Sequence, residues 1–145
     1  MAWRGQRVTV VLDASVVVSA LVDSTSEGRW AASLMEKEPL ACPQIAMTEV
    51  SNVLRRLEVA GIISTQKATE GLNVLIRLDV ELHPFTPYAQ RIWSPRHNMT
   101  CYDACYVALA EALRCPLANF DRRLARSAGL HCELIFPPPL ADSSA

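Results

Sequence analysis

The chain has 145 residues, half of them hydrophobic and a fifth charged, which is the usage of a globular protein rather than a disordered or fibrous one. Its 14 Lys and Arg against 15 Asp and Glu give a net charge of −1, so any surface that binds nucleic acid must be locally basic. This length fits one domain, whose core needs neither a disulfide nor zinc.

Apolar runs alternate with amphipathic segments along most of the sequence. The runs predict strands over residues 8–12, 40–42, 80–83, 117–120 and 131–136. The segments predict helices over residues 14–21, 26–38, 45–60, 64–78, 88–96, 100–113 and 122–128. This alternation is typical of a parallel sheet with helices on both faces. We therefore expect a single α/β/α sandwich with a mostly parallel sheet over residues 8–136, preceded by a short lead (1–7) and followed by a frayed, Pro-rich tail (137–145).

Apolar stripes predict which faces of two helices enter the core. On the helix over 64–78 the stripe contains Leu72, Leu75 and Ile76, which could also form a dimer seam. On the helix over 100–113 the stripe consists of Tyr102, Tyr106, Leu109 and Leu113.

The cysteines and the N-terminal apolar run bear on the compartment. The five Cys residues are scattered without a C-x-x-C pair, so we expect reduced thiols in a cytoplasmic protein. The run over residues 8–18 loosely resembles a signal peptide, but Asp13 interrupts it. No segment approaches the roughly 18 apolar residues of a membrane span, so we expect no membrane partner.

Four acidic residues stand where predicted strands end or predicted helices begin. Asp13 and Asp121 each follow a strand, whereas Glu49 and Asp103 each lie near the start of a helix. These points share one edge of a parallel sheet, so the four carboxylates could face one crevice. Each residue alone could be a helix cap. Asp13, however, interrupts an apolar run, and a charge beside a core is costly unless it is paired or metal-bound.

Oxygen ligands of this kind suit particular metals. Carboxylates that lie close together repel, so one is protonated or a cation lies between them. Mg²⁺ and Mn²⁺ prefer oxygen ligands, and either ion can activate water and stabilise charge on a phosphoryl group. The sequence therefore indicates a site for metal-assisted hydrolysis at a phosphate.

The same residues lie in motifs that carry a resemblance to a known family. The motifs are Val-Leu-Asp13-Ala-Ser15, Thr48-Glu49-Val-x-Asn-Val-Leu-Arg-Arg, Tyr102-Asp103-Ala-x-Tyr-Val-Ala-Leu-Ala-Glu-Ala and Leu-Ala-Asn-Phe-Asp121-Arg-Arg-Leu-Ala. In this order, over residues 8–136, they resemble the PIN-domain ribonucleases, and more narrowly the VapC-type toxins of prokaryotic type II toxin–antitoxin modules.

The resemblance implies an α/β/α sandwich, a divalent-metal site and endonuclease activity on structured RNA, either tRNA or rRNA. It also implies inhibition of translation, homodimerisation and a VapB-like antitoxin. By motif match, the catalytic and metal-binding residues are Asp13, Glu49, Asp103 and Asp121.

Further residues are expected to support the acidic set or to bind RNA. Ser15, Thr100 and Asn119 are expected to support the acidic residues rather than to bind the metal. Asn119 departs from the family, which often has Thr or Ser there. RNA that approaches an acidic pocket needs basic residues around it. The candidates are Arg55, Arg122, Arg123 and Arg126, with Arg91 and Arg96 as further candidates.

Other functions are less well supported. A phospho-receiver domain needs a Lys after a strand, and neither Lys37 nor Lys67 follows one. A dehalogenase-type phosphatase needs a second Asp where Ser15 stands. Nothing brings two of the three His residues together for metal-free cleavage. The alternative from another class is a PIN fold that captures RNA or a protein without cleaving it.

Overall fold

The computed structural model of the chain describes residues 8–140. Five strands form one parallel sheet in the order β3-β2-β1-β4-β5. The strands are β1 (Val10–Leu12), β2 (Leu40–Pro43), β3 (Val80–His83), β4 (Leu117–Ala118) and β5 (Leu134–Ile135). From β1 the chain adds strands in one direction as far as β3, then returns to place β4 and β5 on the other side of β1. The strand order therefore reverses between β1 and β4.

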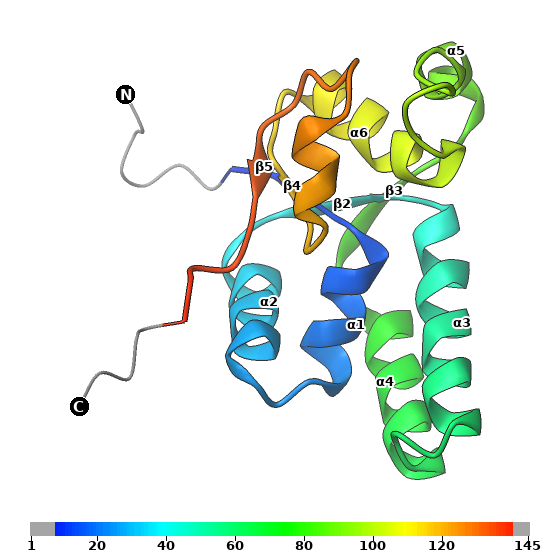
Figure 1. Ribbon diagram of the computed structural model, residues 1–145. Coiled ribbons are helices and arrows are strands. Elements are labelled where there is room, and N and C mark those ends of the chain that lie inside the picture. The colour runs from blue at the N-terminus through cyan, green and yellow to red at the C-terminus, as the bar shows by residue number, and fades with distance from the viewer. Residues whose placement is uncertain (1–7, 141–145) are drawn as a thin grey trace.

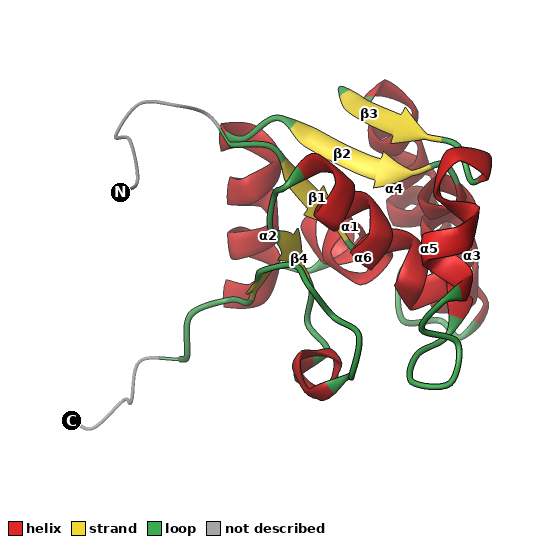
Figure 2. Cartoon of the chain, turned by 90° about the horizontal axis from the view of Figure 1, so that it is seen from above, coloured by secondary structure: helices red, strands yellow, loops and turns green. Residues whose placement is uncertain are grey.

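Helices cover both faces of this sheet. The α-helices are α1 (Ala14–Val22), α2 (Ser26–Lys37), α3 (Ile45–Val59), α4 (Thr65–Arg77), α5 (Ala89–Trp93) and α6 (Cys101–Leu113), and the 3₁₀ turns are η1 (Thr86–Tyr88) and η2 (Arg122–Arg126). α1 to α4 lie on one side of the sheet and α5 and α6 on the other (Figure 1). Seen from above, β1, β2 and β3 run side by side in the same direction (Figure 2). The predicted α/β/α sandwich with a parallel sheet is confirmed.

The end of the described chain is less regular than predicted. The strand expected over 131–136 is only Leu134–Ile135, and the helix expected over 122–128 is the 3₁₀ turn η2. The backbone amide of His131 donates to the Glu111 carboxylate at 2.8 Å instead of joining the sheet. Gly129, with φ of +89°, turns the chain between η2 and β5. The connection is therefore set by a side-chain contact and a glycine turn.

Two predicted stripes need correction. α4 packs against α1 and α3 through Ala68, Gly71 and Leu75, and a Cβ on Gly71 would lie only 3.4 Å from Leu54. Leu72 and Ile76 each follow one residue later, so the helix turns them about 100° away, and they are 40% and 70% exposed.

On α6, Tyr106 and Leu109 are buried as predicted, but Tyr102 is 61% exposed. The buried part of this helix begins only at Ala104.

The remaining expectations concern the termini, the cysteines and membranes. The lead (1–7) and the last residues of the tail (141–145) lie outside the described residues, and 137–140 form neither helix nor strand. All five cysteines are free thiols, with Cys42 and Cys115 buried and Cys101 exposed. Within residues 8–140, each helix is too short or too polar to cross a bilayer.

Candidate active site

The predicted acidic residues lie where the strand order reverses. Asp13 follows β1, and its backbone amide donates to the carbonyl of Ala118 in β4 at 3.0 Å. An open pocket of about 430 Å³ lies at this edge of the sheet, the usual place for a ligand in a parallel α/β fold. It is lined by Asp13, Ser15, Asp103, Asn119, Phe120, Asp121 and Arg123.

Asp13 is held by the start of the helix that follows it. It is the N-cap of α1, and its carboxylate accepts hydrogen bonds from the Ser15 backbone amide at 2.9 Å and from the Ser15 hydroxyl. Both contacts use Oδ2, so Oδ1 stays available to the pocket. Ser15 thus lies where it can orient Asp13.

Asp103 lies in the first turn of α6, which begins after Thr100. The Thr100 hydroxyl accepts a hydrogen bond from the Asp103 backbone amide at 3.1 Å. Burial raises the pKa of the Asp103 carboxyl, and the charge of Asp13 raises it further, with a smaller contribution from Asp121. Asp13 and Asp103 therefore bring negative charge to the same place, and no Lys, Arg or His among residues 8–140 forms an ion pair with either of them.

Glu49 reaches the same group from the first turns of α3. Burial raises the pKa of its carboxyl, followed by the charges of Asp13 and Asp103. Its Oε1 atom is buried and has no hydrogen-bond partner among the described residues. Glu49 does not line the open pocket itself, although its carboxyl lies close enough to Asp13 and Asp103 for their charges to act on it.

Asp121 differs from the other three because a basic residue pairs with it. Arg123 donates to its carboxylate at 3.1 Å, and these contacts lower the pKa of Asp121. The buried Asn119 side chain accepts a hydrogen bond from the Asp121 backbone amide at 2.8 Å. The side-chain oxygen of Asn119 thus anchors the backbone of Asp121, at a position where the family often has the hydroxyl of Thr or Ser.

The acidic group fits a hard divalent cation in its chemistry. Among residues 8–140, no three or more His, Cys, Asp or Glu side chains are arranged so that they could hold a metal ion as they stand. Mg²⁺, however, is usually held by one or two carboxylates and several waters. The unpartnered Oε1 of Glu49 and the raised pKa values of Glu49 and Asp103 both mark negative charge that a cation would offset.

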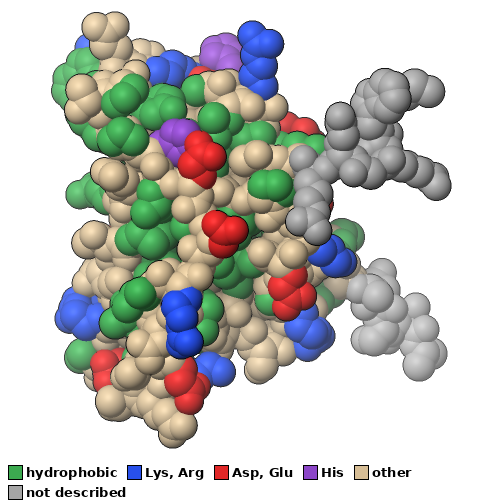
Figure 3. Space-filling model, turned by 180° about the vertical axis from the view of Figure 1, so that it is seen from behind, with side chains coloured by type: hydrophobic (Ala, Val, Ile, Leu, Met, Phe, Trp, Pro, Cys, Tyr) green, Lys and Arg blue, Asp and Glu red, His purple; other side chains and the backbone are tan. Residues whose placement is uncertain are grey.

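Three of the four predicted RNA-binding arginines lie on η2, which begins directly after Asp121. Arg123 lines it, Arg126 is exposed, and Arg122 stacks its guanidinium over Phe136 at 4.6 Å. Arg55 instead lines a groove between α3 and α4 and bonds Asn52 at 3.0 Å. On the opposite face of the molecule, Lys and Arg side chains are scattered (Figure 3).

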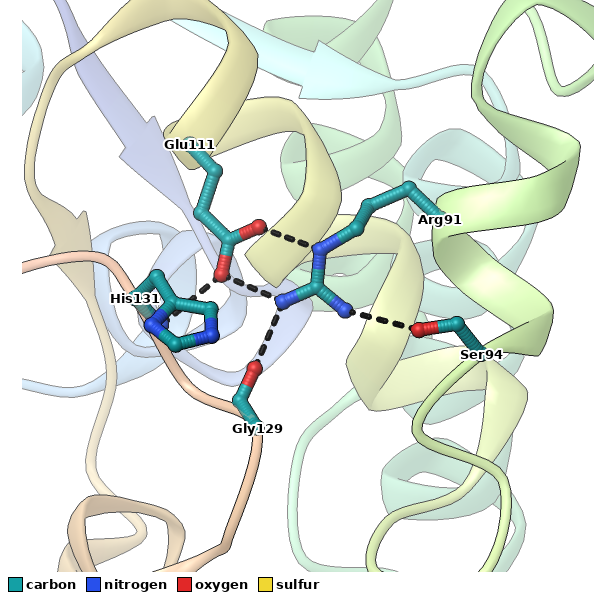
Figure 4. Close-up of polar contacts among 5 residues, drawn as sticks. All are labelled: Arg91, Ser94, Glu111, Gly129 and His131. Carbon is teal, nitrogen blue, oxygen red and sulfur yellow. Dashed lines mark hydrogen bonds and ion pairs between the residues drawn. The ribbon is translucent and has the colours of Figure 1, made fainter.

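Arg91, a further candidate for phosphate binding, is occupied by an internal ion pair. Its guanidinium contacts both oxygens of Glu111 and also donates to the carbonyl of Gly129 at 2.6 Å (Figure 4). These contacts leave the Arg91 guanidinium less free to bind a phosphate, and its binding to RNA stays a prediction. Arg96 stacks on the exposed ring of Trp93 at 4.7 Å.

Comparison with known proteins agrees with this geometry. The PIN domain family matches residues 10–130. Ribonuclease VapC1 of Mycobacterium tuberculosis (strain CDC 1551 / Oshkosh) is 38% identical over 125 residues, which cover 86% of this chain and 94% of that protein. The chain belongs to the PIN-domain family, among the VapC ribonucleases.

Solved structures share the PIN fold at low sequence identity. The structure of VapBC2 from Rickettsia felis bound to a promoter DNA fragment has a TM-score of 0.64 at 14% identity and covers 88% of this chain and 98% of that one. The structure of Mycobacterium tuberculosis VapC20, described as a Sarcin–Ricin loop cleaving toxin, has a TM-score of 0.61 at 13% identity, with coverages of 81% and 93%. At these identities the likeness shows the fold alone.

Two features of this PIN domain were missed from the sequence. The apolar stripe places Tyr106 only in the core, although it lies three residues after Asp103 on one face of α6 and its hydroxyl lies close to Glu49. That spacing was a usable signal. The pairing of Arg91 with Glu111 joins residues 20 apart, and no local pattern predicts it.

Proposed function

We propose that this PIN domain is a divalent-metal-dependent endoribonuclease that hydrolyses phosphodiester bonds in structured RNA. The observation that carries the proposal is the convergence of Asp13, Glu49 and Asp103 at the reversal of strand order. Two of their pKa values are raised, and Oε1 of Glu49 is buried without a hydrogen-bond partner in the part of the chain that the structure describes. Such a site is poorly explained by stability, because close carboxylates destabilise a fold unless a cation joins them.

Each residue has a role that follows from its contacts. Asp13, Glu49 and Asp103 would hold Mg²⁺ or Mn²⁺, and Asp121 would position water or a second ion. A bound ion of this kind supplies an activated water and neutralises charge on the phosphoryl group. Ser15 holds Asp13 in place through two hydrogen bonds.

Two further residues hold the backbone of acidic residues in place. Thr100 anchors the first turn of the helix that carries Asp103, and Asn119 anchors the backbone of Asp121.

The RNA backbone would approach along η2. Arg122, Arg123 and Arg126 are exposed there, so they can bind phosphates on either side of the one that reacts. Arg123 also pairs with Asp121, so it joins the rim of the site to its acidic interior. We propose tRNA or rRNA as the substrate, in keeping with the Sarcin–Ricin loop that VapC20 is described as cleaving. Cleavage of either RNA would inhibit translation.

We place this activity in a toxin–antitoxin module in the cytoplasm, with a VapB-like antitoxin as partner. The fold's likeness to the VapBC2 structure and the identity with VapC1 support this assignment. We also propose a homodimer. An apolar groove between α3, α4 and β3, which includes the exposed Leu72, Ile76 and Leu82, offers a surface for it. Light scattering of the purified chain and of Ile76→Asp would show whether a dimer forms there.

A second candidate function is a PIN-fold module that binds RNA or protein and cleaves poorly. The observation that favours it is the lack, within residues 8–140, of three ligands already arranged around one point. Mn²⁺ binding without RNA turnover would indicate this function.

Incubation of total cellular RNA with the purified chain tests the main proposal. We expect discrete products with Mg²⁺ or Mn²⁺, none with EDTA, and none from Asp13→Asn or Asp103→Asn. Asp79→Asn, which changes an exposed carboxylate in the turn between α4 and β3, is the matched control and should cleave as the wild type does. Products that persist in EDTA would overturn the metal-dependent mechanism.

A further inference from the structure

Tyr106 on α6 carries a hydroxyl that the core does not need. Its side chain is the largest among the fully buried ones and is only 1% exposed. Its Oη atom has no hydrogen-bond partner among the described residues. A buried hydroxyl without a partner costs free energy, whereas phenylalanine would fill the same space without that cost. The hydroxyl therefore calls for an explanation other than packing.

The groups around this hydroxyl belong to the acidic site. The Tyr106 hydroxyl lies close to the carboxyl of Glu49, and Asp13 and the backbone amide of Ala14 are near it. Both Tyr106 Oη and Glu49 Oε1 are buried, and neither atom has a hydrogen-bond partner among residues 8–140.

The helix that carries the Tyr106 hydroxyl also carries an acidic residue of the site. Tyr106 lies three residues after Asp103, so the two side chains leave the same face of α6. Glu49 comes from α3, and its carboxyl lies close to Asp13 and Asp103, which line the pocket. The Tyr106 hydroxyl is therefore carried by the same helix as Asp103 and lies close to the carboxylate of Glu49.

We propose that Tyr106 is a positioning residue, whose hydroxyl donates a hydrogen bond to Glu49 and turns that carboxylate toward a divalent cation shared with Asp13 and Asp103. The inference rests on the proposed function, because it assumes that the acidic group holds such a cation. Partners behind the ligands commonly orient them in this way, and their loss typically weakens metal binding about 10- to 100-fold. The two unpartnered atoms then pair when the site is filled.

Calorimetric titration of the metal-free full chain with Mn²⁺ tests this role. We expect Tyr106→Phe to weaken Mn²⁺ binding by about tenfold or more. The Tm of the metal-free variant should equal or exceed that of the wild type, because only an unpaired hydroxyl is lost. Tyr102→Phe is the matched control on the same helix, with an exposed ring, and should bind Mn²⁺ as the wild type does.

A double-mutant cycle shows whether the hydroxyl acts through Glu49. In a Glu49→Gln background, Tyr106→Phe should cause no further loss of Mn²⁺ affinity. The inference is overturned if Tyr106→Phe binds Mn²⁺ as tightly as the wild type, or if its Tm falls sharply because the hydroxyl serves the fold. If the wild type itself binds no Mn²⁺, the proposed function fails first, and the inference fails with it.

Discussion

Arg91 on α5 binds Glu111 on α6 through two parallel contacts, from Nε at 2.6 Å and from Nη2 at 2.7 Å. The same guanidinium donates to the carbonyl of Gly129, and Glu111 accepts from the backbone amide of His131. Two helices and the segment between η2 and β5 are therefore joined by one half-buried ion pair (Figure 4). Paired contacts of this geometry are stronger than a single exposed ion pair.

Arg91→Ala should lower the stability of the protein. It leaves the half-buried Glu111 carboxylate and the Gly129 carbonyl without this donor, and hydrogen bonds to charged groups contribute roughly 1.5–3 kcal/mol. For a domain of this size, that corresponds to a fall in Tm of roughly 5 °C. Arg96→Ala, which removes an exposed arginine stacked on Trp93, is the control and should change Tm little. Equal Tm values for the two variants would show that the ion pair does not stabilise the fold.

Glu49→Gln should raise the Tm of the metal-free protein at neutral pH. The pKa values of Glu49 and Asp103 are raised from 4.5 and 3.8 in the folded state, so the folded chain binds more protons than the unfolded chain. The stability that these two groups contribute is therefore fully present at a pH below their ordinary pKa values. It is lost as the pH rises through their raised pKa values in the folded state. Glu49→Gln removes the part of this loss that the ionised Glu49 carboxylate causes, so its Tm should be higher by a few degrees.

The pH dependence provides the check on this prediction. The difference in Tm between Glu49→Gln and the wild type should shrink toward zero as pH falls well below 4.5, where Glu49 is protonated in both states. Glu36→Gln, on the exposed side of α2, should show no such trend. A glutamine variant that is less stable than the wild type at neutral pH would mean that the Glu49 carboxylate is compensated in the metal-free protein.

The sequence predicts which acidic residues lie close together better than it predicts how the helices around them pack. Asp13 and Asp103 could be placed together because parallel strands end at one edge, and the topology brings the ends of β1 and β4 side by side. Local periodicity could not separate Leu75 from Leu72, because their exposure depends on how closely Ala68 and Gly71 let α4 approach its neighbours. Contacts between distant segments, such as Arg91 with Glu111, lie outside what local patterns can predict.

Arg126→Ala should weaken RNA binding in the catalytically impaired Asp103→Asn background. Each lost phosphate contact should reduce the slope of log affinity against log salt by about 0.7 to 0.9. Arg55→Ala is the matched control, because Arg55 lies in the groove between α3 and α4 and bonds Asn52. Filter binding to fragments of the cleaved RNA, over a series of salt concentrations, measures both. If Arg126→Ala leaves the slope unchanged, RNA does not approach along η2.

The rate of RNA cleavage as a function of Mn²⁺ concentration, after removal of metal with EDTA, tests the central claim most directly. The account predicts no cleavage without metal and a rate that rises and saturates with Mn²⁺. Asp103→Asn should be slower by at least about 100-fold at saturation, because stabilisation of charge at the reacting phosphate is lost. A wild-type rate that is independent of Mn²⁺, or an Asp103→Asn rate equal to it, would contradict a metal-dependent nuclease built on this acidic group.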